Sequence, residues 1–504
     1  MNFTFPPPSL IAIYLNQSQI ELFNNGSLTQ DLFEHFQSSL LSIFGDIPRY
    51  SNHHLNGFCN QIESNDESTF ILEVGRRLPP SEFPDPDIDE IYFAYFQGIY
   101  PLLSQELTRK LIERHKKYFS QYSFSENLPP GMVPVFISRE FVSTLPENLS
   151  LGVHEYLLKN INQYDTEILF ESPDLRKYRL NFTCNTLSSI TQSESLLNSN
   201  IDVNHSQLET IIKENSNILR LGPSYINLEL IDNCNLKCEF CPRSLNNHQN
   251  GNHSLDPEII KTFMKRIDST YRNEFQICLG GNGEPLLYND LKKVLELIGS
   301  LSNLNRLIIE SSLSTDITDF LNILENLDKN ILNKIVIIVN LSTLNTGLYQ
   351  KLYSSSDTPE TILKKMESIL KVFPKENLYV QILKIKEVES EIESYFNFFE
   401  EKGYKIILQK YNSRANQMIE RRVNDLTPIH RDFCWHLTRD LEIHANGNVT
   451  ACKQSDIVLG NVYTEEVTLL WEKNHERFLN SLNHLHERND TPCLNCDEWY
   501  TFNG

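Results

Sequence analysis

The chain has 504 residues and a formal net charge of -21, from 45 lysine and arginine against 66 aspartate and glutamate residues. An acidic chain without a basic block repels a phosphate backbone, which disfavours nucleic acid as a partner. Hydrophobic residues make up 40% and aromatic residues 10%, enough for packed cores, and the length predicts two to four domains.

The N-terminus, MNFTFPPPSLIAIYLN, has no positively charged segment before an apolar run, so we expect no signal peptide. No run of about 18 apolar residues occurs, so we expect no membrane span. These features predict a cytoplasmic protein whose thiols stay reduced. The ten cysteines are therefore expected to be metal ligands rather than disulfides, and seven of them fall into two clusters.

Residues 1–215 show strands alternating with helices. SLIAIYLN (residues 9–16), IYFAYFQGIYPLL (91–103) and VPVFI (133–137) read as buried strands or strand starts. Leu107, Leu111, Ile112 and Tyr118 have helical spacing. This alternation predicts an α/β domain that ends near residue 215, after a polar connector.

The order of these pieces resembles the nucleotidyltransferase fold of sugar-activating cytidylyltransferases. FQGIYPLL is similar to that family's Gly-Asp-x-Pro-Leu turn, and FTCNTLSS (182–189) to its late Asp-Thr-x-x-Asp element. Ile99 stands in place of the metal-binding aspartate, and Asn185 and Ser189 replace the later acids. The resemblance implies a degenerate, catalytically inactive copy, and an unrelated α/β domain is the alternative.

Residues 216–425 alternate strands and helices more regularly. Six strands are expected, at residues 225–231, 274–280, 306–312, 334–342, 379–385 and 405–410. Helices between them, without hairpin signals, predict a parallel sheet with right-handed crossovers. Six units are fewer than the eight of a closed barrel, so we expect an open, partial (βα)6 barrel with its functional residues at the carboxyl ends of the strands.

The first of these strands leads into IDNCNLKCEFCPR (231–243), where Cys234, Cys238 and Cys241 have CxxxCxxC spacing. Three thiolates on one loop can bind a metal centre and leave one coordination position free. The turn GGNGEP (280–285) follows the second strand, with glycines that allow close approach of a ligand and a carboxylate at Glu284. The two features together resemble the radical S-adenosylmethionine (SAM) superfamily.

That resemblance implies that the three cysteines bind a 4Fe-4S cluster whose fourth iron chelates SAM, and it implies roles for eight further residues. Phe240 is expected against the adenine, and Gly281, Asn282, Gly283 and Glu284 near the methionine amino group. Ser311, Ser312 and Asn340 are candidates for the SAM carboxylate and ribose. A zinc site or unlinked thiols remain the alternatives, although zinc would need a fourth ligand, for which Asp232 or a distant histidine would be an arbitrary choice.

Residues 426–504 contain Cys434, Cys452, Cys493 and Cys496. LEIHANGNVTAC (441–452) predicts a hairpin with an Asn-Gly turn, and a helix with Trp471 precedes TPCLNC. The segment resembles the SPASM or shorter twitch domains. Only four of the seven SPASM cysteines are present, which implies one fully ligated auxiliary 4Fe-4S cluster for electron transfer; a four-thiolate zinc site is the alternative.

The whole chain resembles the spiro-SPASM family, with domains expected at 1–215, 216–425 and 426–504. The resemblance implies an oxidoreductase-type radical enzyme that abstracts hydrogen from a peptide or protein side chain, reduced by a flavodoxin or ferredoxin. One alternative is radical chemistry on a sugar or nucleotide-linked molecule presented by the N-terminal domain. Another is a non-catalytic metal-binding scaffold. The sequence identifies no catalytic acid or base.

Overall fold

The computed structural model describes residues 7–64, 66–80, 91–147, 149–198, 204–248, 251–424, 433–485 and 491–498. The chain forms two compact units, residues 1–219 and 220–504. The expected division into three domains, with boundaries near residues 215 and 425, stays a prediction. Among the described residues, no helix is long and apolar enough to cross a membrane.

The N-terminal unit is built on a seven-stranded mixed sheet with strand order β3-β2-β1-β4-β6-β5-β7. Strands β1, β2, β3 and β4 are parallel, and β6 runs antiparallel to both β4 and β5. The strands are β1 (Ile11–Ile13), β2 (Arg49–Ser51), β3 (Asn60–Gln61), β4 (Tyr92–Phe96), β5 (Tyr122–Ser125), β6 (Val135–Ser138) and β7 (Thr166–Leu169).

Helices cover both faces of this sheet, so every residue of β4 is buried. Tyr92, Ala94 and Phe96 join one apolar cluster, while Phe93 and Tyr95 join another, as the two-residue period of a strand requires. The first cluster includes side chains of α2 (Gln30–Phe44) and α4 (Gln105–Tyr118), and the second those of α3 (Glu67–Gly75), α5 (Arg139–Thr144) and α6 (Val153–Lys159). The remaining helices of eight or more residues here are α1 (Gln17–Asn24) and α7 (Leu187–Leu197).

The C-terminal unit contains a nine-stranded sheet with strand order β13-β12-β11-β10-β9-β8-β14-β15-β16. Its first six strands are parallel, in the order expected for a partial (βα)6 barrel. They are β8 (Tyr225–Leu228), β9 (Phe275–Leu279), β10 (Leu304–Ser311), β11 (Ile335–Asn340), β12 (Leu378–Lys384) and β13 (Lys405–Lys410). The predicted partial barrel is confirmed.

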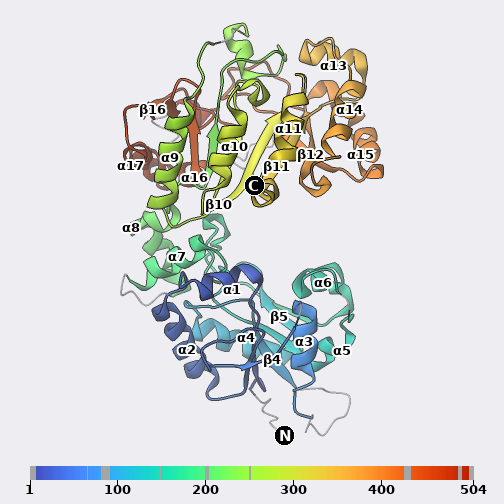
Figure 1. Ribbon diagram of the computed structural model, residues 1–504. Helices are drawn as coiled ribbons and strands as arrows, with labels where there is room; N and C mark the ends of the chain where they lie inside the picture. Colours follow the sequence, from blue (N-terminus) through green and yellow to red (C-terminus); the bar gives the residue numbers. More distant parts are fainter. Residues whose placement is uncertain are drawn as a thin grey trace. The chain divides into compact units, whose positions relative to one another are not determined.

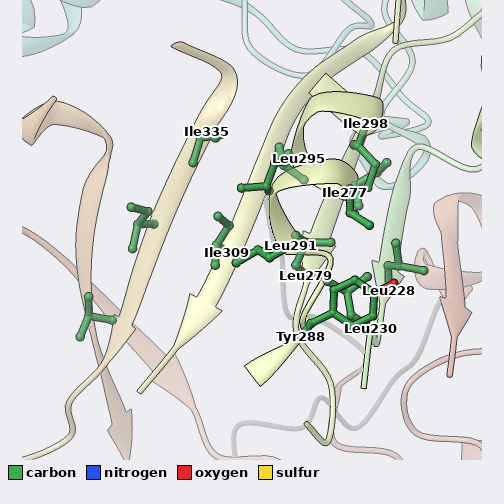
Figure 2. Close-up of a cluster of buried hydrophobic side chains, with 14 of the residues drawn as sticks. Leu228, Leu230, Ile277, Leu279, Tyr288, Leu291, Leu295, Ile298, Ile309 and Ile335 are labelled. Carbon is green, nitrogen blue, oxygen red and sulfur yellow. The ribbon is translucent and has the colours of Figure 1, made fainter. Parts of the chain in front are cut away.

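Seven helices connect these strands (Figure 1). They are α9 (Pro257–Thr270), α10 (Leu291–Gly299), α11 (Thr318–Asn326), α12 (Lys329–Lys334), α13 (Thr346–Tyr353), α14 (Pro359–Ile369) and α15 (Ile392–Glu401). Figure 2 shows how α10 packs against the sheet: its side chains Leu291, Leu295 and Ile298 point toward Ile277 of β9 and Ile309 of β10. Each of these five side chains is almost fully buried, so α10 covers β9 and β10 on this face of the sheet.

Three short strands continue the sheet beyond β8. Strand β14 (Asp440–Ile443) pairs parallel to β8, and β15 (Asn448–Thr450) and β16 (Val458–Asn461) follow antiparallel. The predicted hairpin with an Asn-Gly turn is therefore present as β14 and β15. The helices of this region are α16 (His436–Arg439), α17 (Val467–Lys473), α18 (His475–Leu482) and α20 (Thr491–Leu494). The strands of the cysteine-rich segment are thus part of the barrel sheet.

Candidate active site

The loop after β8 carries Cys234, Cys238 and Cys241, all half-buried. A bridge between Ile231 and Ser254 closes its base, and the Cys241 N–H donates to the Cys238 carbonyl at 3.1 Å. Burial raises the pKa of all three thiols, and the neighbouring Cys241 and Cys234 raise the pKa of Cys238 further. Three thiolates packed this closely need a cationic centre to be stable.

Arg243, two residues after Cys241, supplies fixed positive charge to this loop. Its buried guanidinium donates to the carbonyls of Leu236 and His248, at 3.2 Å each. Against the effect of burial, Arg243 lowers the pKa of each of the three cysteines. The arginine therefore both shapes the loop and favours the thiolate form that a metal requires.

The donor set of this loop consists of three thiols. In the described parts of the chain, no three cysteine, histidine, aspartate or glutamate side chains are placed as the ligands of a single metal ion. Cysteine thiolates are the usual ligands of iron-sulfur clusters, and three of them would leave one iron of a 4Fe-4S cluster open, whereas a structural zinc site needs a fourth protein ligand. By the chemistry of their donor atoms, the three cysteines therefore fit an iron-sulfur cluster.

The predicted Glu284 is a buried carboxylate at the carboxyl end of β9. It accepts hydrogen bonds from Ser311 Oγ (2.7 Å), Ser312 Oγ (3.0 Å) and the N–H groups of Ser312 (3.2 Å) and Leu286 (3.3 Å). Burial raises the pKa of Glu284, and these four donors oppose the rise. The structure thus brings the predicted site residues Glu284, Ser311 and Ser312 together. Both serine hydroxyls donate hydrogen bonds to Glu284.

The glycine turn is fixed to the cysteine loop by backbone contact. The Glu284 N–H donates to the Asn233 carbonyl at 2.9 Å. A Cβ atom at Gly283 would lie 1.7 Å from the carbonyl oxygen of Ile231, so only glycine fits there. The two motifs that are separate in sequence therefore form one rigid surface.

Glu229, just past the end of β8, connects this turn to the C-terminal hairpin. One of its carboxylate oxygens accepts from the Asn282 N–H at 2.7 Å and the other from the Ala445 N–H at 3.2 Å. Gly281 has φ +99°, and a Cβ there would lie 2.8 Å from the carboxylate. By accepting from a backbone N–H of each segment, this buried carboxylate holds the glycine turn and the C-terminal hairpin in fixed positions relative to each other.

Phe240 and Asn340 each contact a neighbouring side chain of the barrel. Phe240 is half-buried and packs edge-on against Tyr353 of α13, with ring centroids 5.2 Å apart. Asn340 ends β11, and its side-chain oxygen accepts from the Gln381 amide of β12 at 2.7 Å. Their predicted contacts with adenine and ribose stay predictions.

A polar cavity of about 610 Å³ opens beside these motifs. Its lining includes Asp232 and Arg243 of the cysteine loop, Asn282 of the glycine turn, Glu229, and His444 of the hairpin. Arg414, from the segment after β13, also lines it and pairs with Asp456 at 3.3 Å. Burial lowers the pKa of His444, which keeps its imidazole neutral at pH 7. The cavity therefore offers groups of both charges next to the proposed cluster.

The four C-terminal cysteines also converge. Cys434, Cys452, Cys493 and Cys496 line a small cavity of about 30 Å³. Burial, followed by the three neighbouring thiols, raises the pKa of Cys434 well above its usual value. His436 lines the same cavity, but its ring nitrogens are engaged by Asp440 (2.5 Å) and by the Glu498 carbonyl (3.2 Å). The donor set is therefore four thiols.

Sequence reasoning assigned no role to Glu229, Arg243, Arg414 or His444. A signal existed for Arg243, because a cationic side chain two residues after the third cysteine is close enough to reach the loop. Glu229 gave no such signal, since its contact with the Ala445 N–H joins segments more than 200 residues apart.

Comparison with known proteins identifies two domains in this unit. Residues 228–399 match the family model of the radical SAM superfamily, and residues 434–497 match the SPASM iron-sulfur cluster-binding domain. An uncharacterized protein of Treponema pallidum is 28% identical over 361 residues, which cover 70% of this chain and 98% of that protein. A probable GTP 3',8-cyclase of Methanocaldococcus jannaschii is 24% identical over 273 residues, covering 47% of this chain and 88% of the relative.

Solved structures with partial similarity include anSMEcpe with bound AdoMet and Streptococcus suis SuiB bound to its precursor peptide SuiA. The first has a TM-score of 0.40 at 14% identity, covering 52% of this chain and 81% of that structure. The second has a TM-score of 0.43 at 13% identity, covering 71% and 83%.

Proposed function

Because the chain carries a radical SAM domain followed by a SPASM domain, we propose that it is an oxidoreductase-type radical enzyme acting on a peptide or protein side chain. The radical SAM domain binds a 4Fe-4S cluster and SAM, and SPASM domains bind further iron-sulfur centres. Held at Cys234, Cys238 and Cys241, the cluster would supply one-electron cleavage of SAM and a 5'-deoxyadenosyl radical that removes hydrogen from the substrate.

The observation that carries the proposal is the junction of the cysteine loop with the glycine turn. Arg243 favours the thiolates of the loop, and the Glu284 N–H and Gly283 lock the turn onto the loop's backbone. With the Glu284 carboxylate held by four donors, the backbone of the turn stays in one conformation. In our proposal, this fixed backbone receives the methionine end of SAM, and Phe240 receives the adenine.

The cavity of about 610 Å³ supports a peptide as the substrate. Glu229, Arg414 and His444 place a carboxylate, a guanidinium and a neutral imidazole around it. Such a lining can bind the N–H and C=O groups of a peptide backbone while one side chain reaches the reacting centre. The cavity lies between the radical SAM motifs and the SPASM hairpin, so a bound peptide would contact both domains.

The C-terminal cysteines would hold one auxiliary 4Fe-4S cluster in our proposal. Four thiols would bind all four irons of such a cluster and leave no position for the substrate, so the cluster would serve electron transfer. It would supply an acceptor for one electron of a substrate that has already given up a hydrogen atom and that also releases one proton to the medium. The net change is the loss of two hydrogens.

Anaerobic incubation of reconstituted protein with SAM and dithionite tests the radical step. We expect 5'-deoxyadenosine from the wild type and from Cys59→Ala, whose cysteine lies outside both clusters, and none from Cys238→Ala. Absence of the nucleoside from wild-type protein with full iron content would contradict the proposal.

The substrate class needs a second measurement. We expect a peptide fraction of a cell extract to increase the yield of 5'-deoxyadenosine, and mass spectrometry to find peptides that have lost two hydrogens. Stimulation by the small-molecule fraction alone would contradict the peptide assignment and leave the radical chemistry intact.

A further inference from the structure

The N-terminal unit contains a cavity of about 820 Å³ that the radical chemistry does not use. It lies at the carboxyl ends of three parallel strands, where Asn16 follows β1, Gln97 follows β4 and Glu126 follows β5. Ligands of open α/β sheets bind at this edge. The position of the cavity therefore marks it as a candidate ligand site.

Close backbone contacts shape the walls of this cavity. Gly98 has φ +136°, and a Cβ there would lie 2.4 Å from the Thr183 carbonyl oxygen. Gly131 has φ +96°, and a Cβ there would lie 2.5 Å from the Phe182 carbonyl. Buried Gln19 ties the walls together by donating to the carbonyls of Gln97 (3.1 Å) and Thr183 (3.4 Å). Three chain segments are thus locked around a preformed space.

The charges of the lining cancel. The carboxylates of Glu67 and Glu126 are matched by the guanidinium groups of Arg176 and Arg179. Burial lowers the pKa of His154, so this lining residue is neutral at pH 7. A cavity without net charge favours a ligand without net charge.

Two of these charged groups, Arg176 and Glu67, are also engaged by the protein. Arg176 donates from Nε to both oxygens of Asp174, at 3.0 and 3.1 Å. Glu67 accepts from Tyr95 Oη and Gln97 Nε2, at 2.6 Å each, and from the Val153 N–H at 3.1 Å. A phosphate would meet two carboxylates here, and a metal ion would have to displace these donors. The lining is therefore poorly suited to a nucleotide or a cation.

The amide groups present both kinds of hydrogen-bonding atom. Gln97 donates its Nε2 to Glu67, which leaves its side-chain oxygen as an acceptor. Asn185 accepts on its oxygen from Asn181 Nδ2 (3.2 Å) and Ser189 Oγ (3.3 Å), which leaves its NH₂ group as a donor. Hydroxyl groups match such a lining because each of them both donates and accepts.

Aromatic rings complete the lining. Tyr14 packs against Phe70 with ring centroids 5.7 Å apart, and Phe124 packs edge-on against His154 at 4.8 Å. Held by these contacts, the rings offer fixed apolar faces to the C–H surface of a ligand.

We propose that this cavity binds a neutral polyhydroxylated ligand, of the class of a short oligosaccharide. Pockets of ~300–1,000 Å³ hold ligands of several linked rings, so the space exceeds what one sugar unit needs. The amides bind the hydroxyl groups, and the aromatic rings contact the ring faces. The site is independent of the radical chemistry and binds its ligand whether or not the metal centres are loaded.

Saturation-transfer NMR on the full chain tests the proposal, with a panel of neutral oligosaccharides of glucose, mannose, galactose and N-acetylglucosamine as probes. We expect at least one of them to bind, and Asn185→Ala to weaken its binding at least tenfold. Gln30→Ala, on an exposed position of α2 outside the cavity, is the matched control and should bind as the wild type does. Thermal melting verifies that both variants are folded.

Competition separates this proposal from the nearest alternatives. UTP, CTP and inorganic phosphate should leave the oligosaccharide signal unchanged. Binding of none of the oligosaccharides, retention of binding in Asn185→Ala, or displacement by a nucleotide would each overturn the proposal.

Discussion

Replacing Glu284 with glutamine tests whether this carboxylate organises the glycine turn. Each carboxylate oxygen accepts from one serine hydroxyl and one backbone N–H. A glutamine NH₂ group can be accommodated by rotation of a serine hydroxyl, but a backbone N–H cannot become an acceptor. Whichever way the amide turns, one buried N–H therefore loses its partner.

The expected magnitude follows from that lost bond. An unsatisfied buried N–H costs about 1–3 kcal/mol. Burial raises the pKa of Glu284, so removing its charge also relieves desolvation and offsets part of the cost. We expect a net loss of about 1–2 kcal/mol in the stability of the turn, which lowers SAM affinity by about 5- to 30-fold.

Anaerobic calorimetry with SAM measures this loss, and iron analysis verifies equal cluster content. Glu296→Gln, an exposed change on α10, is the matched control and should bind SAM as the wild type does. Equal SAM affinity in Glu284→Gln and wild type would refute the reasoning.

Three further changes test other parts of the chain. Glu229→Gln removes the charge that two backbone N–H groups share and should weaken SAM binding about tenfold at unchanged iron content, measured by the same calorimetry. Cys234→Ala and Cys493→Ala should each lower the iron content from about eight to about four per chain, and an unchanged iron count in either variant would show that its site holds no cluster. Burial first, and the nearby Glu229 carboxylate after it, raise the pKa of Glu442 to about 8, against the opposing effect of the hydrogen bond from Asn227. Because the folded protein holds this proton more tightly, the stabilisation is complete below pH 4.5 and is lost as the pH rises to 8, at about 1.4 kcal/mol per unit. Thermal melts from pH 5 to 8 should therefore show a smaller decline in Glu442→Gln than in the wild type, and parallel curves would contradict the assignment.

The positions of the cysteine loop and glycine turn follow from the sequence because strand–helix alternation fixes their ends. Strands β8 and β9 are neighbours in the parallel sheet, so the segments after them meet at one edge. This geometry places Cys234 and Glu284 in the same site, although 50 residues separate them in the sequence.

Partners that come from distant segments could not be predicted. Glu229 meets the Ala445 N–H only because β14 pairs with β8, and no local pattern encodes that pairing. The hydroxyls of Ser311 and Ser312 donate hydrogen bonds to Glu284. These bonds depend on the rotamers of the two serines, which the apolar periodicity of the sequence does not predict.

The N-terminal unit shows the same limit. Its strands follow from apolar runs, and Ile99, which stands at the expected aspartate position, is buried in the apolar core. The cavity is invisible in the sequence because residues between 14 and 185 contribute to its wall, each with an ordinary local role such as a helix cap. The resemblance of this unit to nucleotidyltransferases stays a prediction.

The pairing of β14 with β8 sets an order of assembly. The strand that completes the edge of the barrel beside the cysteine loop is translated about 200 residues after that loop. Until then β8 has one side without a partner, an exposed edge on which another chain can pair, and the Glu229 carboxylate lacks one of its two donors. We therefore expect a chain cut after residue 424, which lacks β14, to expose this edge of β8 and to aggregate through it.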